Sequence, residues 1–222
     1  GYVLKYVKNL RCSMNSQPIG FIDSGVGGLT VAKEVMKLLP NERIYYLGDS
    51  KRNPYGPRSV EEVRHFARQL SYFLLEKNIK FLVIACNTAS VAALETLQEE
   101  LPIPVIGVIE YGTKAAVNQT KNKKIGMIGT QGTVQSKAYE KQIINNLSDA
   151  QVKSVTCPKL ITIVEKNQFN GEIAENIVAE ELASFKNTDI DTLVLGCTHY
   201  PLLQSTIQDY LGDKVTLVDP GV

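Results

Sequence analysis

Short apolar runs alternate with amphipathic helical segments along this chain, and this alternation restricts its fold more than any other sequence feature. The runs at 19–22, 81–85 and 192–196 are each four or five residues long, and they have no polar alternation. Continuous apolar strands of this kind are typical of parallel sheets that helices cover on both faces. The fold class that we predict is therefore α/β, with mainly parallel sheets flanked by helices.

Local signals add three further expectations. Ser59 and Glu62 have the spacing of a capping box, which predicts that a helix starts there. The apolar run at 104–109 predicts another strand. The stretch after the predicted strand at 152–156 is expected to be less regular.

Two of the predicted strand ends occur twice, in the same order and at similar separations. The segment IGFIDSG at 19–25 is similar to IGMIGTQ at 125–131, and LVIACNT at 82–88 is similar to LVLGCTH at 193–199. The offsets between the copies are 106 and 111 residues. We therefore predict a duplicated structure of two pseudo-symmetric domains, with one cysteine at an equivalent position in each. The polar residues at these strand ends then belong to two facing sites or to one active site in the cleft between the domains.

Length and composition exclude several classes of protein. A chain of 222 residues can form two small domains that each bury a core, and 44% hydrophobic content argues against disorder. The net charge of +1 gives no reason to expect nucleic acid as a partner. The longest apolar runs, 81–86 and 103–109, are far shorter than the roughly 18 residues that indicate a membrane span. We expect neither a nucleic-acid nor a membrane partner.

The segment before the first patterned strand carries no expected function. Met14 stands just before that strand, so residues 1–13 are interpreted as an expression remnant or a nonstandard start. These residues are basic but lack the apolar core of a secretory signal. Four cysteines are too few for a disulfide scaffold. Together these observations favour a cytoplasmic location with reduced thiols.

Polar residues directly follow four of the predicted strands, namely Asp23, Cys86, Thr130 and Cys197. Ligands of doubly wound sheets bind outside the carboxyl ends of the strands, where helix N-termini also point. A cysteine at such a position lies near the positive end of a helix dipole and near N–H donors, which favours the thiolate. Because an unperturbed thiol with a pKa of about 8.5 is only about 3% ionised at pH 7, a catalytic role requires a lowered pKa.

A symmetric pair of thiols suits one kind of chemistry in particular. Inverting a carbon centre by proton transfer needs a base on one face and an acid on the other, with the roles exchanged in the reverse direction. Redox chemistry is the competing use, but it favours a local C-x-x-C pair, which is absent. A buried cysteine can also be a small core residue, and we interpret Cys12 and Cys157 in this way.

Other candidate sites are weaker. The stretch SGVGG at 24–28 resembles a phosphate-binding loop, but the dinucleotide spacing would require glycine where Thr30 stands. Its glycines are better explained by a tight turn whose N–H groups face a carboxylate. Since the cysteines form no C-x-x-C pair and only His65 and His199 could assist them, no metal site is expected. Glu165 is compatible with a simple surface position.

Taken together, six motifs resemble the cofactor-independent aspartate/glutamate racemase family, and within it the glutamate racemases. They occur in the family's order from Pro18 onward. The pair ACNTAS and GCTHYPLL is the most specific, and a related aspartate racemase would typically have glutamate where His199 stands. The motifs are IGFIDSGVGGLTV (19–31), IYYLGDSKRNPYGPRS (44–59), LVIACNTAS (82–90), IGMIGTQGT (125–133), CPKLITIVE (157–165) and LVLGCTHYPLL (193–203).

The resemblance implies racemisation of L- and D-glutamate without a cofactor, which supplies D-glutamate for peptidoglycan. It implies that Cys86 transfers the proton of the D-enantiomer and Cys197 that of the L-enantiomer. Asp23 and His199 are the implied polar partners of the thiols and of the substrate's ammonium group, with Glu165 assisting Cys197. The remaining implied substrate contacts are Ser24, Asn87, Thr88, Thr130 and Thr198, with Tyr55 and Gly56 at the distal carboxylate.

The resemblance also implies domain bounds. The first domain is expected at 18–110 and the second at 111–211, with the chain returning to the first after about residue 212. Relatives continue beyond VDPG with a further helix, so an end at Val222 suggests truncation. Residues 51–53 and Glu110–Tyr111 depart from the usual family sequence, which bears on loop dynamics and affinity. Two alternative functions remain open: racemisation of another amino acid such as aspartate, and non-catalytic binding of an amino acid. A homodimer is a possible assembly.

Overall fold

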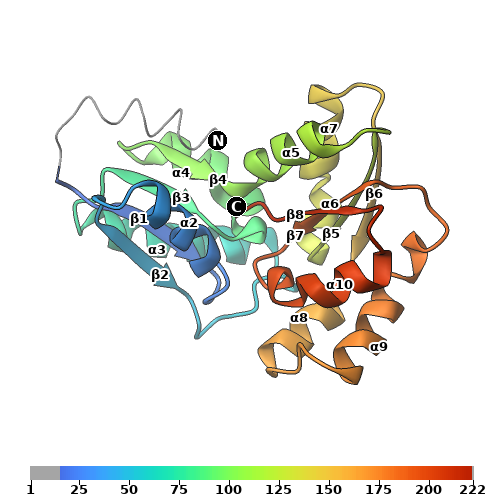
Figure 1. Ribbon diagram of the computed structural model, residues 1–222. Helices are drawn as coiled ribbons and strands as arrows, with labels where there is room; N and C mark the ends of the chain where they lie inside the picture. Colours follow the sequence, from blue (N-terminus) through green and yellow to red (C-terminus); the bar gives the residue numbers. More distant parts are fainter. Residues whose placement is uncertain (1–15, 222) are drawn as a thin grey trace. The chain divides into compact units, whose positions relative to one another are not determined.

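The computed structural model describes residues 16–221 and consists of two α/β units (Figure 1). The expectations for residues 1–13, Cys12 included, lie outside the described residues. Among the described residues, the first unit contains 16–111 and Gly221, and the second contains Gly112–Pro220. Each unit has one four-stranded sheet in which all neighbouring strands are parallel. This arrangement confirms the predicted fold class of two domains with parallel sheets.

The first unit has the strand order β2-β1-β3-β4. Its central strands are buried along their whole length, which explains their continuous apolar sequence. Helix α3 begins at the predicted capping box, where the Glu62 N–H donates to Ser59 Oγ at 3.2 Å. The elements are β1 (Ile19–Asp23), α2 (Leu29–Leu38), β2 (Ile44–Gly48), α3 (Val60–Leu75), β3 (Phe81–Ile84), α4 (Asn87–Glu100) and β4 (Val105–Gly107).

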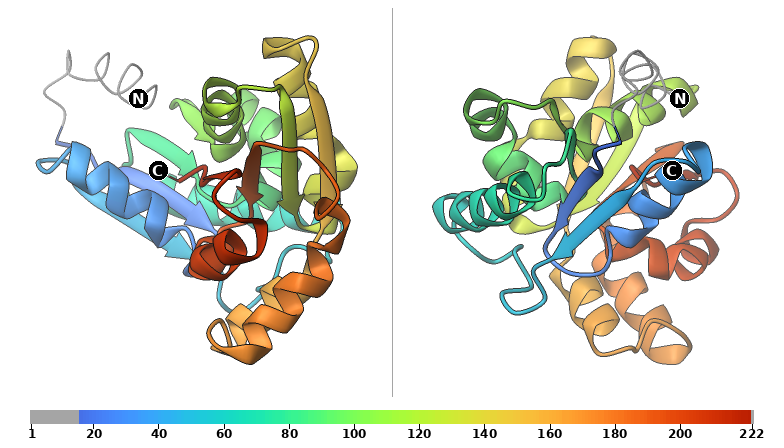
Figure 2. Two further views of the ribbon diagram at one scale, coloured as in Figure 1. Left: turned by 45° about the vertical axis from the view of Figure 1, so that its right-hand side comes forward. Right: turned by 90° about the vertical axis from the view of Figure 1, so that its left-hand side faces the viewer.

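Two hydrophobic clusters cover the two faces of this sheet. One cluster packs α3 and α4 against Ile22, Leu82 and Ile84. The other packs α2 against Phe21 and Val83. The right-hand view of Figure 2 shows α2 and α3 on opposite sides of the strands. Alternate side chains of the same strands thus enter two cores, as a parallel sheet covered on both faces requires.

The second unit has the strand order β6-β5-β7-β8, which repeats the order of the first unit. Helices α8, α9 and α10 share one hydrophobic cluster with β5 and β7, and α6 and α7 pack against β5 and β6. The elements are β5 (Lys124–Gly129), α6 (Gln131–Ser136), α7 (Ala138–Asn146), β6 (Gln151–Thr156), α8 (Pro158–Glu165), α9 (Glu172–Glu181), η1 (Ala183–Phe185), β7 (Thr192–Gly196), η2 (Tyr200–Leu203), α10 (Gln204–Leu211) and β8 (Thr216–Val218).

The structure differs from the sequence expectations at three places. The apolar run at 104–109 is a strand only to Gly107, and helix α5 (Val108–Gln119) begins directly after it, since a short apolar run does not distinguish strand from helix. The irregular stretch after residue 156 contains α8, which starts with Pro158 at its first position. The expected return to the first domain after about residue 212 does not occur there, because β8 pairs with β7.

None of the helices within residues 16–221 combines the length and the apolarity that crossing a membrane requires.

Candidate active site

In both sheets the chain connections change direction between the first and third strands of the unit. The predicted site residues lie at the carboxyl ends of these two strands. In each sheet the first and third strands of the unit are central neighbours, and the connections leave them toward opposite edges. Ligands bind such sheets at the carboxyl ends of these two strands. In the first unit Asp23 ends β1 and Cys86 follows β3. In the second unit Thr130 follows β5 and Cys197 follows β7. The two cysteines therefore occupy topologically equivalent positions, as predicted.

The carboxylate of Asp23 is held by donors from two neighbouring segments. Its Oδ2 accepts hydrogen bonds from the main-chain N–H groups of Gly25 at 3.0 Å and Gly28 at 3.2 Å. The hydroxyl of Tyr46, from β2, lies 3.2 Å from the same oxygen and 2.9 Å from the carbonyl oxygen of Gly25. The glycine turn thus does direct N–H groups at a carboxylate, and that carboxylate is the chain's own Asp23.

Only glycine fits at position 28. A Cβ atom there would lie 2.7 Å from Cβ of Ala85 and 3.0 Å from Cβ of Asp23. This close approach lets the N–H of Gly28 reach the carboxylate. Asp23 is only 1% exposed, and its Oδ1 has no hydrogen-bond partner among the described residues. A buried carboxylate oxygen without a donor is costly, so this atom is suited to bind a donor on a ligand, such as an ammonium group.

Cys86 is the N-cap residue of α4. Its Sγ accepts from the N–H of Ala89 at 3.4 Å, and Ser24 contributes both its main-chain and side-chain donors. The thiol is 4% exposed, and the adjoining Asn87 and Thr88 are also buried in the first turn of the helix. These donors would stabilise a thiolate that forms during a reaction, because they already point at the sulfur.

The expected lowering of the Cys86 pKa is wrong. Burial, followed by the negative charge of Asp23, raises the pKa of the thiol to about 11, although hydrogen bonds from Ala89 and Ser24 act in the opposite direction. Removing the sulfur from water and placing a carboxylate beside it outweigh the helix terminus. At neutral pH Cys86 therefore holds its proton, which suits it to act as an acid in the resting protein.

The contribution of Asp23 to the raised pKa of Cys86 can be tested with the variant Asp23→Asn. In a protein whose only cysteine is Cys86, we expect the thiol to ionise at a lower pH than about 11, because the second cause of the raised pKa is removed. Thiolate absorbance near 240 nm, followed against pH, measures the change. The control is Asp149→Asn, which removes an exposed carboxylate from the other unit. An unchanged or raised pKa of the Cys86 thiol in Asp23→Asn would show that the charge of Asp23 does not raise that pKa.

Three side chains form a chain of polar contacts in the second unit. Sγ of Cys197 lies 3.5 Å from Nδ1 of His199, and the other ring nitrogen, Nε2, pairs with Oε1 of Glu165. Glu165 is the last residue of α8, and His199 precedes η2. The imidazole can take the thiol proton while the carboxylate orients the ring and stabilises the imidazolium. Glu165 is therefore more than the surface residue that its sequence context allowed.

The other predicted residues divide between the two units. Thr130 caps α6, with its Oγ1 accepting from the N–H of Thr133 at 3.2 Å, and Thr198 is buried next to Cys197. Cys157 lies in the hydrophobic core, and burial raises its pKa to about 12, as expected for a structural cysteine. The first unit gathers Asp23, Ser24, Tyr55, Gly56, Cys86, Asn87 and Thr88, and the second gathers Thr130, Glu165, Cys197, Thr198 and His199.

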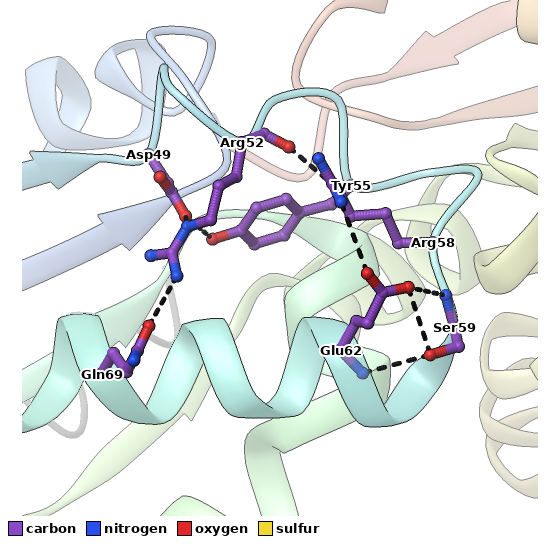
Figure 3. A network of polar contacts seen from close by, with 7 residues as sticks. All are labelled: Asp49, Arg52, Tyr55, Arg58, Ser59, Glu62 and Gln69. Carbon is purple, nitrogen blue, oxygen red and sulfur yellow. Dashed lines mark hydrogen bonds and ion pairs between the residues drawn. The ribbon is translucent and has the colours of Figure 1, made fainter.

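Tyr55 and Gly56 lie in the 49–58 loop, which follows β2; Figure 3 shows Tyr55 in this loop. The loop leaves the same end of the sheet as Asp23, because Asp23 pairs with Gly48 in parallel. Both residues are buried. The Tyr55 hydroxyl donates to Oδ2 of Asp49 at 2.5 Å. The main-chain N–H groups of Tyr55 and Gly56 find no acceptor within residues 16–221. The donors that Tyr55 and Gly56 can offer to a ligand are thus their main-chain N–H groups.

Sequence reasoning missed Tyr46 and Asp49. Burial, and then the charge of Asp23, raises the pKa of Tyr46 above its ordinary value, so its hydroxyl remains a donor. Both residues belong to the segment IYYLGDS, and a polar residue directly after a strand was the available signal for Asp49. Tyr46 gave no such signal, because a strand tyrosine is more often a packing residue.

Within residues 16–221, no three or more His, Cys, Asp or Glu side chains are gathered in a way that could hold a metal ion.

Comparison with known proteins now places this chain in a family. The family model described as Asp/Glu/hydantoin racemase matches residues 27–222. The glutamate racemase of Carnobacterium sp. (strain St2) is 56% identical over 208 residues, which cover 94% of this chain and 78% of that protein. The chain belongs to the Asp/Glu/hydantoin racemase family.

Solved structures of Asp/Glu/hydantoin racemase relatives have the same fold. A glutamate racemase isoform from Bacillus anthracis matches with a TM-score of 0.89 at 50% identity, covering 92% of this chain and 77% of that one. The Francisella tularensis glutamate racemase, solved in complex with D-glutamate, matches with a TM-score of 0.86 at 40% identity, covering 93% and 77%. The sequence resemblance to this racemase family is thereby confirmed.

Proposed function

We propose that this chain interconverts L- and D-glutamate, with Cys86 and Cys197 as the two proton-transferring groups. The observation that carries the proposal is the equivalent placement of the two cysteines, each after the third strand of its unit, with different partners. Cys86 is a protonated thiol near Asp23, whereas Cys197 has His199 as a proton acceptor. The names of the relatives support glutamate as the substrate. The provision of D-glutamate for peptidoglycan is the role that the resemblance to the racemase family implies.

The reaction from L- to D-glutamate follows from these partners. Cys197 transfers its proton to His199, and the resulting thiolate removes the α-proton of L-glutamate, leaving the electron pair on the α-carbon. Cys86 then donates its thiol proton to the opposite face, which inverts the centre and leaves a Cys86 thiolate. The N–H and hydroxyl donors of Ala89 and Ser24 stabilise that thiolate. The reverse reaction exchanges the two roles, as microscopic reversibility requires.

Substrate binding is assigned to polar groups at the carboxyl ends of the strands and in the 49–58 loop. Oδ1 of Asp23 is the candidate acceptor for the ammonium group. The N–H groups of Tyr55 and Gly56 are the candidate donors to the distal carboxylate. Asn87, Thr88, Thr130 and Thr198 are candidate partners of the rest of the amino acid. Each of these groups carries polarity that a bound amino acid would match.

Racemisation in heavy water tests the proposal. We expect L-glutamate to lose optical rotation and to gain deuterium at the α-carbon at matching rates, and we expect aspartate to react at least about 10²-fold more slowly. If aspartate reacted faster than glutamate, the substrate would be wrongly assigned, but the proposed two-thiol mechanism would still stand. Binding of glutamate, measured by calorimetry, without inversion or exchange would support a binding module instead and would refute the enzymatic proposal.

A further inference from the structure

The carboxylate of Asp49 joins the 49–58 loop to the end of the sheet and to α3 (Figure 3). Asp49 directly follows β2, and its main-chain N–H donates to the carbonyl oxygen of Asp23 at 3.0 Å. Its side chain is 7% exposed, and Oδ2 accepts from both Tyr55 Oη at 2.5 Å and Arg52 Nε at 2.6 Å. One buried oxygen thus holds the start and the middle of the loop together.

The arginine in this network extends the connection to α3. Nη1 of Arg52 donates to Oε1 of Gln69 at 2.5 Å, and its guanidinium lies 4.0 Å from the ring centroid of Phe66. The ring of Tyr55 lies 5.7 Å from the same phenylalanine. The carbonyl oxygen of Arg52 accepts from Nε of Arg58 at 2.9 Å. Arg52 and Arg58 therefore fasten the loop at other points, whereas the bond to Asp49 is the hydrogen bond that holds the Tyr55 side chain.

The hydrogen bond to Asp49 limits what Tyr55 can offer to a ligand. Because its hydroxyl is occupied by Asp49, Tyr55 has only its main chain to offer a ligand. Burial, and then the hydrogen bond to Asp49, raises the pKa of Tyr55 above its ordinary value, so the hydroxyl stays a donor throughout the working range of pH. Gly56 is the next residue, so the bond to Asp49 sets the direction of two adjacent main-chain N–H groups.

We propose that Asp49 is a positioning residue for substrate specificity, which acts through Tyr55 and Arg52 to aim the N–H groups of Tyr55 and Gly56 at the distal carboxylate of the substrate. The inference rests on the proposed function, which places that carboxylate at this loop. Preorganised donors bind an anion more strongly than donors that must first be ordered. Asp49 therefore contributes to affinity for glutamate and little to the proton transfers.

Steady-state kinetics of Tyr55→Phe, Asp49→Asn and the double variant test this role. Tyr55→Phe keeps the ring and removes only the bond. We expect it to raise KM for glutamate about tenfold, with kcat changed less than about twofold. Asp49→Asn should act in the same direction. The double variant should raise KM by less than the product of the two single effects, because both changes act on one shared contact. Tyr45→Phe, at a 40% exposed tyrosine of β2, is the matched control.

A ligand without a distal carboxylate separates positioning from general damage. The inhibition constant of 2-aminobutyrate should stay within about twofold in Tyr55→Phe, because this amino acid does not use the loop's donors. A parallel rise in that constant, a fall in kcat at constant KM, or kinetics equal to those of Tyr45→Phe would overturn the inference. A wild-type chain without racemase activity would instead refute the proposed function, so the two failures are distinguishable.

Discussion

Replacing either Cys86 or Cys197 with alanine is expected to lower racemisation of glutamate by at least about 10³-fold. Each change removes the only group proposed to transfer a proton on one face of the α-carbon, and positioned acid–base groups contribute effects of this size. Polarimetry and α-deuterium exchange measure the loss. Where residual exchange is seen, it should keep the configuration of the substrate, because one remaining thiol serves one face only.

The control for this pair is Cys157→Ala. Cys157 is fully buried in the core of the second unit, where its thiol contacts main-chain oxygens only weakly. We expect this variant to keep activity within a few-fold of the wild type, and we expect the same of Cys12→Ala. A loss in Cys157→Ala as large as that in Cys86→Ala, in a folded protein, would mean that the functional thiols are wrongly assigned.

Replacing His199 with asparagine is expected to lower kcat by about 10²-fold or more. The change removes the group that we propose accepts the Cys197 proton, at 3.5 Å from the sulfur. The two enantiomers are equally stable in solution, so kcat/KM must fall equally in both directions. The step that slows is the removal of the α-proton by Cys197. We therefore expect a larger primary isotope effect with α-deuterated L-glutamate than the wild type shows.

A milder change at the other end of the same contact chain provides the comparison. Glu165→Gln keeps a hydrogen-bonding group beside Nε2 of His199 but removes the charge that stabilises the imidazolium. The fall in kcat should be smaller for Glu165→Gln than for His199→Asn, and it should arise in the same kinetic step. If His199→Asn racemised glutamate at the wild-type rate, with an unchanged isotope effect, the histidine would have no part in proton transfer.

The fold was predictable because its sequence signals are local. Continuous apolar strands, the capping box at Ser59 and Glu62, and the repeated strand ends depend on neighbouring residues or on comparison within the chain. The elements that escaped prediction had weaker local signals. Helix α8 has only eight residues, and α5 starts within an apolar run that a strand could equally use.

The candidate site was predictable to a smaller extent. Residues that end central strands, such as Asp23, Cys86 and Cys197, are recognisable because chain order places them at the carboxyl edge of a sheet. The contact between Glu165 and His199 is not recognisable in this way, because 34 residues separate its partners. The hydrogen bond from Tyr46 to Asp23 likewise joins residues 23 positions apart, which become neighbours only when β1 and β2 pair in the sheet.

The sequence by itself thus determined an α/β chain built from a duplicated unit, with a cysteine after the third strand of each copy, since short-range patterning and topology suffice for that. Only the tertiary structure decided the chemistry of those cysteines. It buried Cys86 beside Asp23 and so raised its pKa, gave Cys197 a histidine held by Glu165, and bound Tyr55 to Asp49. Proton affinity and donor direction depend on burial and on distant neighbours, and these exist only once the chain has folded.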